Sequence, residues 1–144
     1  MFKVLIAYDT RTGNTSQMAQ AVAEGAKSVD EVEVILKKVK EVRGELADAD
    51  ALIIGAPTQS KQPSKAMRDF LPRLSKVSLK DKAGAAFGSY GWSGEAPGII
   101  EKTLRDKGVR IVAETLKVKG MPDETGLDEC VSLGYTVATN ITHV

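Results

Sequence analysis

Apolar positions along this chain follow two periods that alternate from one end to the other. Short apolar runs are typical of strands, and between them apolar residues are spaced three and four apart, as on the buried face of a helix. The predicted strands are 3–8, 32–36, 51–55, 83–87 and 110–118, and the predicted helices are 16–29, 64–74, 97–104 and 123–142. Strands that alternate with helices predict an α/β fold, a parallel sheet with helices on both faces.

Local features refine this arrangement. The run 51–55 is continuously apolar and predicts a central strand, whereas polar alternation in 32–36 predicts an edge strand. We expect Glu114 to interrupt the last strand. Pro72 predicts a kink in the helix 64–74, because its ring clashes with the preceding turn. Pro97 suits a helix start, and the helix that follows is predicted to bury Ile99, Ile100 and Leu104.

Length and composition predict one domain, 1–144, with 42% hydrophobic and 27% charged residues. The single cysteine excludes an intramolecular disulfide. The single histidine, His143, is the next-to-last residue, so the chain has few side chains for metal-dependent or histidine-dependent catalysis. No apolar run approaches the roughly 20 residues of a membrane span. The chain enters a strand directly, which leaves no room for a signal peptide, so we expect a cytoplasmic protein.

The loop between the first strand and first helix is rich in hydroxyl groups: Thr10, Arg11, Thr12, Gly13, Asn14 and Thr15. The first N–H groups of a helix have no intrahelical partner, and the helix dipole is positive there. Threonine hydroxyls can complete the shell of donors around a phosphate. The alternative is an ordinary N-cap turn, where Thr and Asn are common. Three threonines, an Asn and a Gly within six residues favour the phosphate site.

Two further loops follow the strands 51–55 and 83–87, and in a parallel sheet they lie at the same edge as the first loop. The loop 56–63 is stiffened by two prolines and carries polar groups that could pair with the edge of a heteroaromatic ring. The loop 88–94 contains the only tryptophan, a tyrosine and three glycines. Ordinary packing at the sheet rim is the alternative. Beside a phosphate loop, however, the aromatic pair favours a stacking surface for a mononucleotide.

The net charge of +1 indicates no nucleic-acid partner, but the charge is uneven. Between 61 and 82 the basic residues outnumber the acidic residues. These are Lys61, Lys65, Arg68, Arg73, Lys76, Lys80 and Lys82, against Asp69 and Asp81. Such a stretch is either a solvated helix face or a docking patch. If Lys61, Lys65, Arg68, Lys80 and Lys82 form one patch near the ligand rim, the partner would be acidic.

The three loops together resemble the flavodoxin family of short-chain type. The first loop is similar to the phosphate loop T/S-x-T-G-x-T, and the runs 88–94 and 56–58 are most similar to the flavodoxin domains of flavodiiron proteins. The resemblance covers Phe2 to about Ile141. It implies FMN as cofactor, single-electron transfer and a three-layer flavodoxin-like fold, whose five-stranded parallel sheet has the order 2-1-3-4-5.

The resemblance also implies roles for individual residues. The phosphate would be held by Thr10, Thr12, Gly13, Asn14 and Thr15, with Arg11 as a charge partner. Thr58, Gln59 and Ser60, together with Pro57 in the same loop, would border the isoalloxazine on one side, and Ser89, Tyr90, Gly91, Trp92 and Gly94 would border it on the other. The implied protein is an electron carrier rather than an enzyme, with redox proteins docking near the flavin rim and no nucleic acid or membrane as partner.

Two departures and two rival functions accompany this resemblance. Typical flavodoxins are strongly acidic, and many have a glycine in the second loop, where Thr58 to Lys61 has none. Both departures predict two one-electron potentials that lie closer together than in an acidic, glycine-containing flavodoxin.

The rivals are an NAD(P)H:quinone oxidoreductase of the same fold and a flavin module that docks on a separate diiron protein. A Rossmann domain is disfavoured, because the first loop has one glycine where G-x-G-x-x-G is required.

Overall fold

The computed structural model describes residues 1–142; His143 and Val144 lie outside the described residues. The strands are β1 Phe2–Tyr8, β2 Val32–Lys38, β3 Ala51–Gly55, β4 Thr58–Gln59, β5 Gln62–Pro63, β6 Ala83–Tyr90, β7 Arg110–Ile111 and β8 Leu116–Lys119. The helices are α1 Asn14–Lys27, α2 Glu45–Asp48, α3 Lys65–Phe70, α4 Ala96–Asp106 and α5 Glu124–Thr142, with 3-10 turns η1 Val39–Glu41 and η2 Leu71–Lys76.

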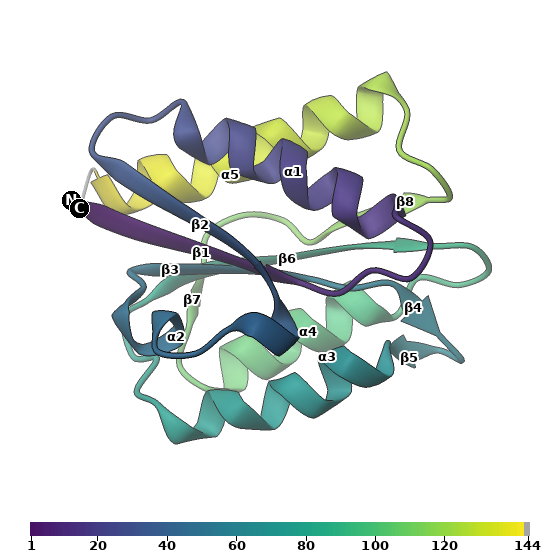
Figure 1. The fold of residues 1–144 in the computed structure, drawn as a ribbon, viewed down its shortest axis with the longest axis horizontal. Coiled ribbons are helices and arrows are strands. Elements are labelled where there is room, and N and C mark those ends of the chain that lie inside the picture. The colour runs from purple at the N-terminus through teal and green to yellow at the C-terminus, as the bar shows by residue number, and fades with distance from the viewer. Residues whose placement is uncertain (143–144) are drawn as a thin grey trace.

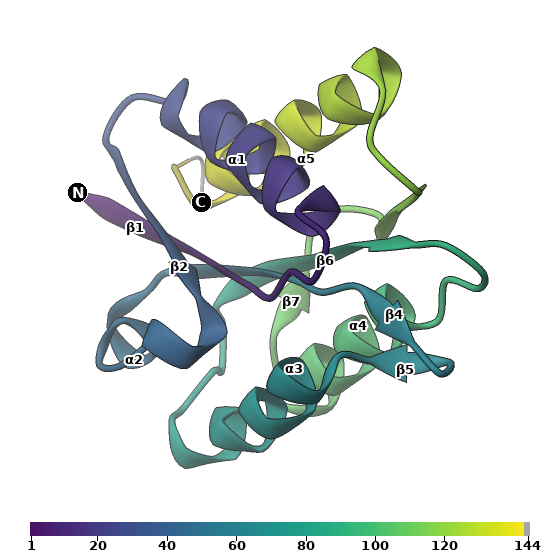
Figure 2. The ribbon, with the colours of Figure 1, turned by 45° about the vertical axis from the view of Figure 1, so that its right-hand side comes forward.

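The main sheet is parallel throughout and has the order β2-β1-β3-β6, with β7 and β8 both paired to β6. β7 and β8 are the two halves of the predicted fifth strand, so the order 2-1-3-4-5 and the interruption around Glu114 are confirmed. Helices α1 and α5 cover one face, while α3 and α4 cover the other (Figure 1; Figure 2). The fold is therefore the predicted three-layer α/β arrangement.

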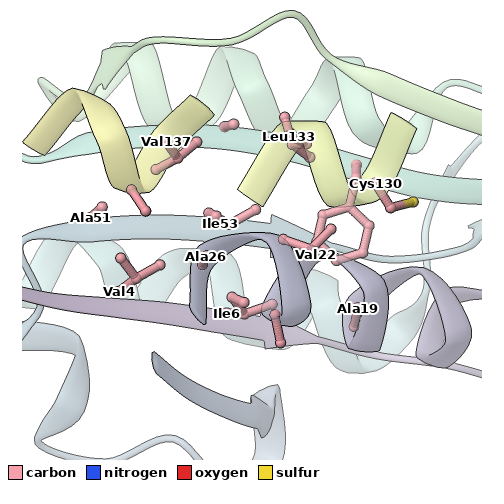
Figure 3. Close-up of a cluster of buried hydrophobic side chains, with 14 of the residues drawn as sticks. Val4, Ile6, Ala19, Val22, Ala26, Ala51, Ile53, Cys130, Leu133 and Val137 are labelled. Carbon is pink, nitrogen blue, oxygen red and sulfur yellow. The ribbon is translucent and has the colours of Figure 1, made fainter. Parts of the chain in front are cut away.

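Each face of the sheet has its own apolar core, because successive residues of a strand point to opposite faces. Val4 and Ile6 of β1 are buried against α1 and α5, whereas Leu5 and Ala7 are buried on the face of α3 and α4. Figure 3 shows the first of these clusters, with Cys130 of α5 among the aliphatic side chains. Burial raises the pKa of the Cys130 thiol to about 12, which fits an inert core residue.

Helices α1 and α5 pack so closely that their backbones touch through two glycines. A Cβ atom on Gly25 would lie 1.9 Å from the carbonyl oxygen of Val131, and one on Gly134 would lie 1.9 Å from the carbonyl oxygen of Val22. Both contacts are with backbone, which cannot rotate away as a flexible side chain could. Because the hydroxyl-rich loop leads into α1, this contact also fixes where that loop lies.

Several local predictions differ from the structure. β6 extends three residues beyond the predicted 83–87, because Phe87 to Tyr90 pair with β8. At Leu71 helix α3 changes into η2, with Pro72 in the first turn, which is the form that the predicted kink takes. Ile99 was predicted to be buried, but its side chain is 39% exposed. Ile99 lies on the flank of α4, while Ile100 and Leu104 face the core.

The basic run between 61 and 82 does not form one patch. Lys61 belongs to the tip between β4 and β5, at the carboxyl edge of the sheet. Lys82 immediately precedes β6 at the opposite edge, where its ammonium group donates to the carbonyl oxygens of Ala47 and Ala49. The condition of a single basic patch near the rim is therefore not met, because Lys61 and Lys82 lie at opposite edges of the sheet.

Candidate functional site

Strands β1, β3 and β6 end at one edge of the sheet, where their loops enclose a cavity of about 280 Å³. The residues lining it come from all three loops singled out in the sequence, and from one further turn. They are Arg11, Thr12, Asn14, Pro57, Thr58, Gln59, Ser89, Tyr90, Gly91 and Gly120. The size is close to the lower end for small-molecule sites, about 300 Å³. The sequence prediction of one shared site thus agrees with the geometry.

The first loop has the chemistry of an anion site. Gly13, the N-cap of α1, has φ +94°, a left-handed conformation that glycine adopts without strain. The Thr10 Oγ1 accepts hydrogen bonds from the N–H groups of Gly13 (3.1 Å) and Ser16 (3.4 Å), which holds the loop in shape. Within residues 1–142, the N–H groups of Asn14 and Thr15 have no acceptor. These free donors at the positive end of α1 fit a phosphate.

Thr15 ties the first loop to the third. Its side chain is 1% exposed, and its hydroxyl lies 2.7 Å from the hydroxyl of Ser89, which is 5% exposed. The hydrogen bond joins the first turn of α1 to the end of β6 behind the cavity. The hydroxyl of Thr15 therefore stabilises the wall of the site, while its backbone N–H stays free for an anion.

A second internal bond was not predicted from the sequence. The Ser64 hydroxyl donates to the Asp9 Oδ2 at 2.5 Å, and the Ser64 N–H donates to the Pro57 carbonyl at 3.2 Å. These bonds join Ser64, which precedes α3, to the end of β1 and to the loop after β3. Nothing in the local pattern around Asp9 or Ser64 indicates this pairing, since 55 residues separate them.

The second loop is a β-hairpin, β4–β5, whose two tip residues both have positive φ, 52° at Ser60 and 65° at Lys61. Two-residue hairpin loops of type I′ require this conformation at both positions. Ser60 and Lys61 thus adopt positive φ although neither is a glycine, because the two-residue hairpin turn requires it. The Thr58 Oγ1 accepts a hydrogen bond from the Ala96 N–H at 2.9 Å, which joins the hairpin to the start of α4.

The third loop presents its aromatic residues differently from one another. Tyr90 lines the cavity, whereas the Trp92 side chain is 94% exposed beside it. Gly120, which follows β8, was not predicted from the sequence as a site residue. Its φ is +69°, and its N–H donates to the Tyr90 carbonyl at 2.7 Å, closing this side of the cavity. The signal was a glycine at the carboxyl end of a strand, where ligands of parallel sheets bind.

Two lysines lie on the rim around Glu95. A hydrogen bond from the Ser93 hydroxyl holds the pKa of the Glu95 carboxyl below its usual value, and the charges of Lys61 and Lys117 act in the same direction. Within residues 1–142, the Glu95 Oε1 is buried without a hydrogen-bond partner. Glu95, at the start of α4 directly after the third loop, therefore carries a negative charge that both lysines stabilise.

A doubly wound sheet with free amide donors, a hairpin and an aromatic loop around one edge cavity is the architecture expected of a mononucleotide-binding domain. The family model described as Flavodoxin matches residues 6–134, and the chain belongs to that family. The cofactor of the family is FMN, and the fold is that of a short-chain flavodoxin. No helix within residues 1–142 has the length and apolar character needed to cross a bilayer.

Similar proteins include both separate flavodoxins and larger flavoproteins. A flavodoxin from the domain Archaea is 34% identical, with a TM-score of 0.94 over 99% of this chain and 100% of that one. Rubredoxin oxygen:oxidoreductase from Desulfovibrio gigas is 29% identical, with a TM-score of 0.92 over 98% of this chain and 36% of that one. Type A flavoprotein fprA from Rhodobacter capsulatus is 34% identical over 96% of this chain and 33% of its own length.

The length comparison separates two groups of relatives. This chain spans between 24% and 36% of the length of the curated relatives it matches. It spans the whole of the archaeal flavodoxin structure. The flavodoxin fold is therefore common to both groups, and the longer relatives have additional chain outside the region that matches.

Proposed function

We propose that the protein is an electron carrier that binds FMN non-covalently in the edge cavity and exchanges single electrons with redox partner proteins. The observation that supports this most strongly is that the edge cavity has hydrogen-bond donors for a phosphate on one side and an aromatic loop on another. Free N–H donors of α1 lie in the first loop, and Tyr90 and Gly91 lie in the third. FMN has a phosphate at one end, a ring at the other, and accepts and releases electrons one at a time.

Each loop has a defined part in this proposal. The N–H groups of Asn14 and Thr15, with the Thr12 hydroxyl and the Arg11 guanidinium, would hold the phosphate by charge-assisted hydrogen bonds. The hairpin residues Thr58 and Gln59 would border the ring on one side. Thr10 would shape the loop from within, because its hydroxyl already accepts two internal bonds.

The third loop would complete the ring site. Tyr90 and Gly91 border the cavity, and Trp92 would stack on the ring, while Gly94 keeps the loop compact. A Cβ atom on Gly94 would lie 3.1 Å from the Tyr90 ring and from the Lys117 side chain. Pro57 and Ser60 would hold the hairpin in place, and Ser89 would support the wall through Thr15.

Direct reduction by a nicotinamide nucleotide tests this function against its enzymatic rival. The rival is an NAD(P)H-dependent oxidoreductase. It is considered because this chain is similar to 36% of the length of an oxygen:oxidoreductase. We expect NADH or NADPH to leave the FMN-loaded protein unbleached in the absence of oxygen and of any reductase. Rapid bleaching of the visible flavin absorbance would instead favour the oxidoreductase. A flavin module docking on a separate diiron protein would, like the carrier, remain unbleached.

Trp92 provides an optical test of the ring site, because it is the only tryptophan. In the apoprotein its exposed indole should emit as a solvated group. We expect FMN to quench this emission almost completely, since stacking brings the two rings into contact. W92A should weaken FMN binding by about 1–3 kcal/mol, the usual value of one stacked ring. Strong emission in the saturated complex would place Trp92 away from the flavin.

A further inference from the structure

Helices α3 and α4 lie on the face opposite α1 and α5 (Figure 2), and residues of α3, η2 and α4 line a groove there. Its volume is about 460 Å³, and Pro63, Leu71, Pro72 and Ile99 form its apolar walls. Ile99 is 39% exposed although it is a large aliphatic residue on an otherwise amphipathic helix. An exposed apolar strip of this kind is suited to a partner that covers it.

The charges along the groove are of one sign. Arg68 and Lys107 line it, and no acidic side chain does so within residues 1–142. The carboxylates on the adjoining helices are engaged elsewhere. Asp69 pairs with Lys65 at 2.9 Å, Asp106 with Lys102 at 2.9 Å, and Glu101 with Arg105 at 3.3 Å. By contrast, a hollow of about 490 Å³ beside α5 is lined by Glu114, Asp128 and Glu129 without a basic residue. The α3–α4 groove therefore favours a negatively charged occupant.

The groove and the candidate flavin cavity share one structural element. In the hairpin, Thr58 pairs with Pro63 and Gln59 with Gln62. Thr58 and Gln59 line the cavity, whereas Gln62 and Pro63 line the groove. The Arg68 Nε–H donates to the Pro63 carbonyl at 3.1 Å, so a charged residue of the groove is bonded directly to the hairpin. An occupant of the groove would contact the reverse side of the flavin wall.

We propose that this groove docks an acidic, apolar segment of the electron-transfer partner, with its aliphatic side chains against Ile99 and Leu71 and its carboxylates facing Arg68 and Lys107. The inference rests on the proposed carrier function and adds to it the place and chemistry of the partner. Helical segments with aliphatic residues on one face commonly bind such grooves. Docking here brings the partner to the hairpin and hence to the flavin.

A designed peptide tests the groove without knowledge of the natural partner. The probe is a fluorescein-labelled helical peptide of about four turns, with leucines on one face and glutamates elsewhere. The comparison peptide has lysine in place of each glutamate. We expect the acidic peptide to bind the FMN-loaded protein and to shift its visible absorbance through the hairpin. We expect the lysine peptide not to bind, and raised salt to weaken the acidic complex.

Matched variants locate the binding. K107E should weaken binding of the acidic peptide about tenfold, because it replaces an attractive charge with a repulsive one. K27E is the control, since Lys27 is also exposed at the end of a helix but lies on α1. Its affinity should stay within about twofold of wild type. I99Q should also weaken binding about tenfold by removing an apolar contact.

The outcomes separate the groove from the carrier function. No peptide binding, or equal loss in K107E and K27E, would overturn the docking site, and so would displacement of the peptide by NADPH, which would assign the groove to a nucleotide. A protein that takes up no FMN yet binds the acidic peptide with the expected variant pattern would leave the groove intact and contradict the carrier function. Each variant is first checked for folding by circular dichroism.

Discussion

Riboflavin is expected to bind the apoprotein at least about a hundredfold more weakly than FMN. Riboflavin lacks the phosphate, so the free N–H groups of Asn14 and Thr15 would gain no charged acceptor. A hydrogen bond to a charged group contributes about 1.5–3 kcal/mol, and losing two therefore costs about 3–6 kcal/mol, more than a hundredfold in affinity. Titration of the apoprotein with each flavin, followed by flavin fluorescence, measures the ratio. Equal affinities would contradict a phosphate site in this loop.

A glycine variant tests whether the loop itself carries this selectivity. Gly13 has φ +94° and open space around its Cβ position, so G13A introduces backbone strain without a steric clash. The left-handed conformation costs a non-glycine residue about 1–2 kcal/mol, and relieving that strain would move the donors of α1. We expect weaker FMN binding and little change for riboflavin. G44A is the control, because Gly44 also has open space but φ −64°.

The largest effect on stability is expected from G134A. The added Cβ would lie 1.9 Å from the backbone oxygen of Val22, and α1 and α5 would have to separate. Overpacking of a buried contact costs about 1–3 kcal/mol, and we expect the upper end because backbone meets backbone. Urea unfolding should show a lower midpoint with an unchanged slope. FMN affinity should fall as well, since α1 carries the first loop.

Two further variants sharpen this expectation. G98A adds a methyl group to helix α4, where nothing lies within 4 Å of the new atom. It should stabilise the protein by about 0.5–1 kcal/mol, as alanine does in place of a helical glycine. G25A meets the Val131 carbonyl at 1.9 Å, and a double variant with G134A should cost less than the sum. A G134A protein as stable as wild type would contradict the close approach of the helices.

The order of the elements could be predicted because each strand is a short apolar run, whereas each helix has apolar residues spaced three and four apart. Ala51 to Gly55 are buried on both faces, which is why the pattern identified a central strand. The hairpin could not be predicted in this way. β4 and β5 have two residues each, too few for a period, and Ser60-Lys61 lacks the Asn-Gly signal of a type I′ turn.

Residues that line the candidate cavity could be indicated from the sequence where the chemistry is concentrated in one loop, but not where it depends on pairing between distant residues. The hydroxyl-rich first loop and the aromatic third loop are visible in the sequence. Ser64 bonded to Asp9, and Gly120 bonded to Tyr90, depend on contacts that only the folded sheet creates. Ile99 was assigned to the core because it is aliphatic and lies within a helical pattern, but position on the helix flank decides its exposure.

Because the last strand is interrupted, its two parts, β7 and β8, pair with β6 independently of each other. β7 pairs with Ala83 and Gly84 at one end of β6, and β8 pairs independently with Phe87 to Tyr90 beside the cavity. Glu114, between them, is exposed. New chain ends opened at Glu114 in a circular permutant, or a segment inserted there, would leave both ladders anchored. Evolution and protein engineering can thus enlarge the molecule at this point while the walls of the flavin site remain as they are.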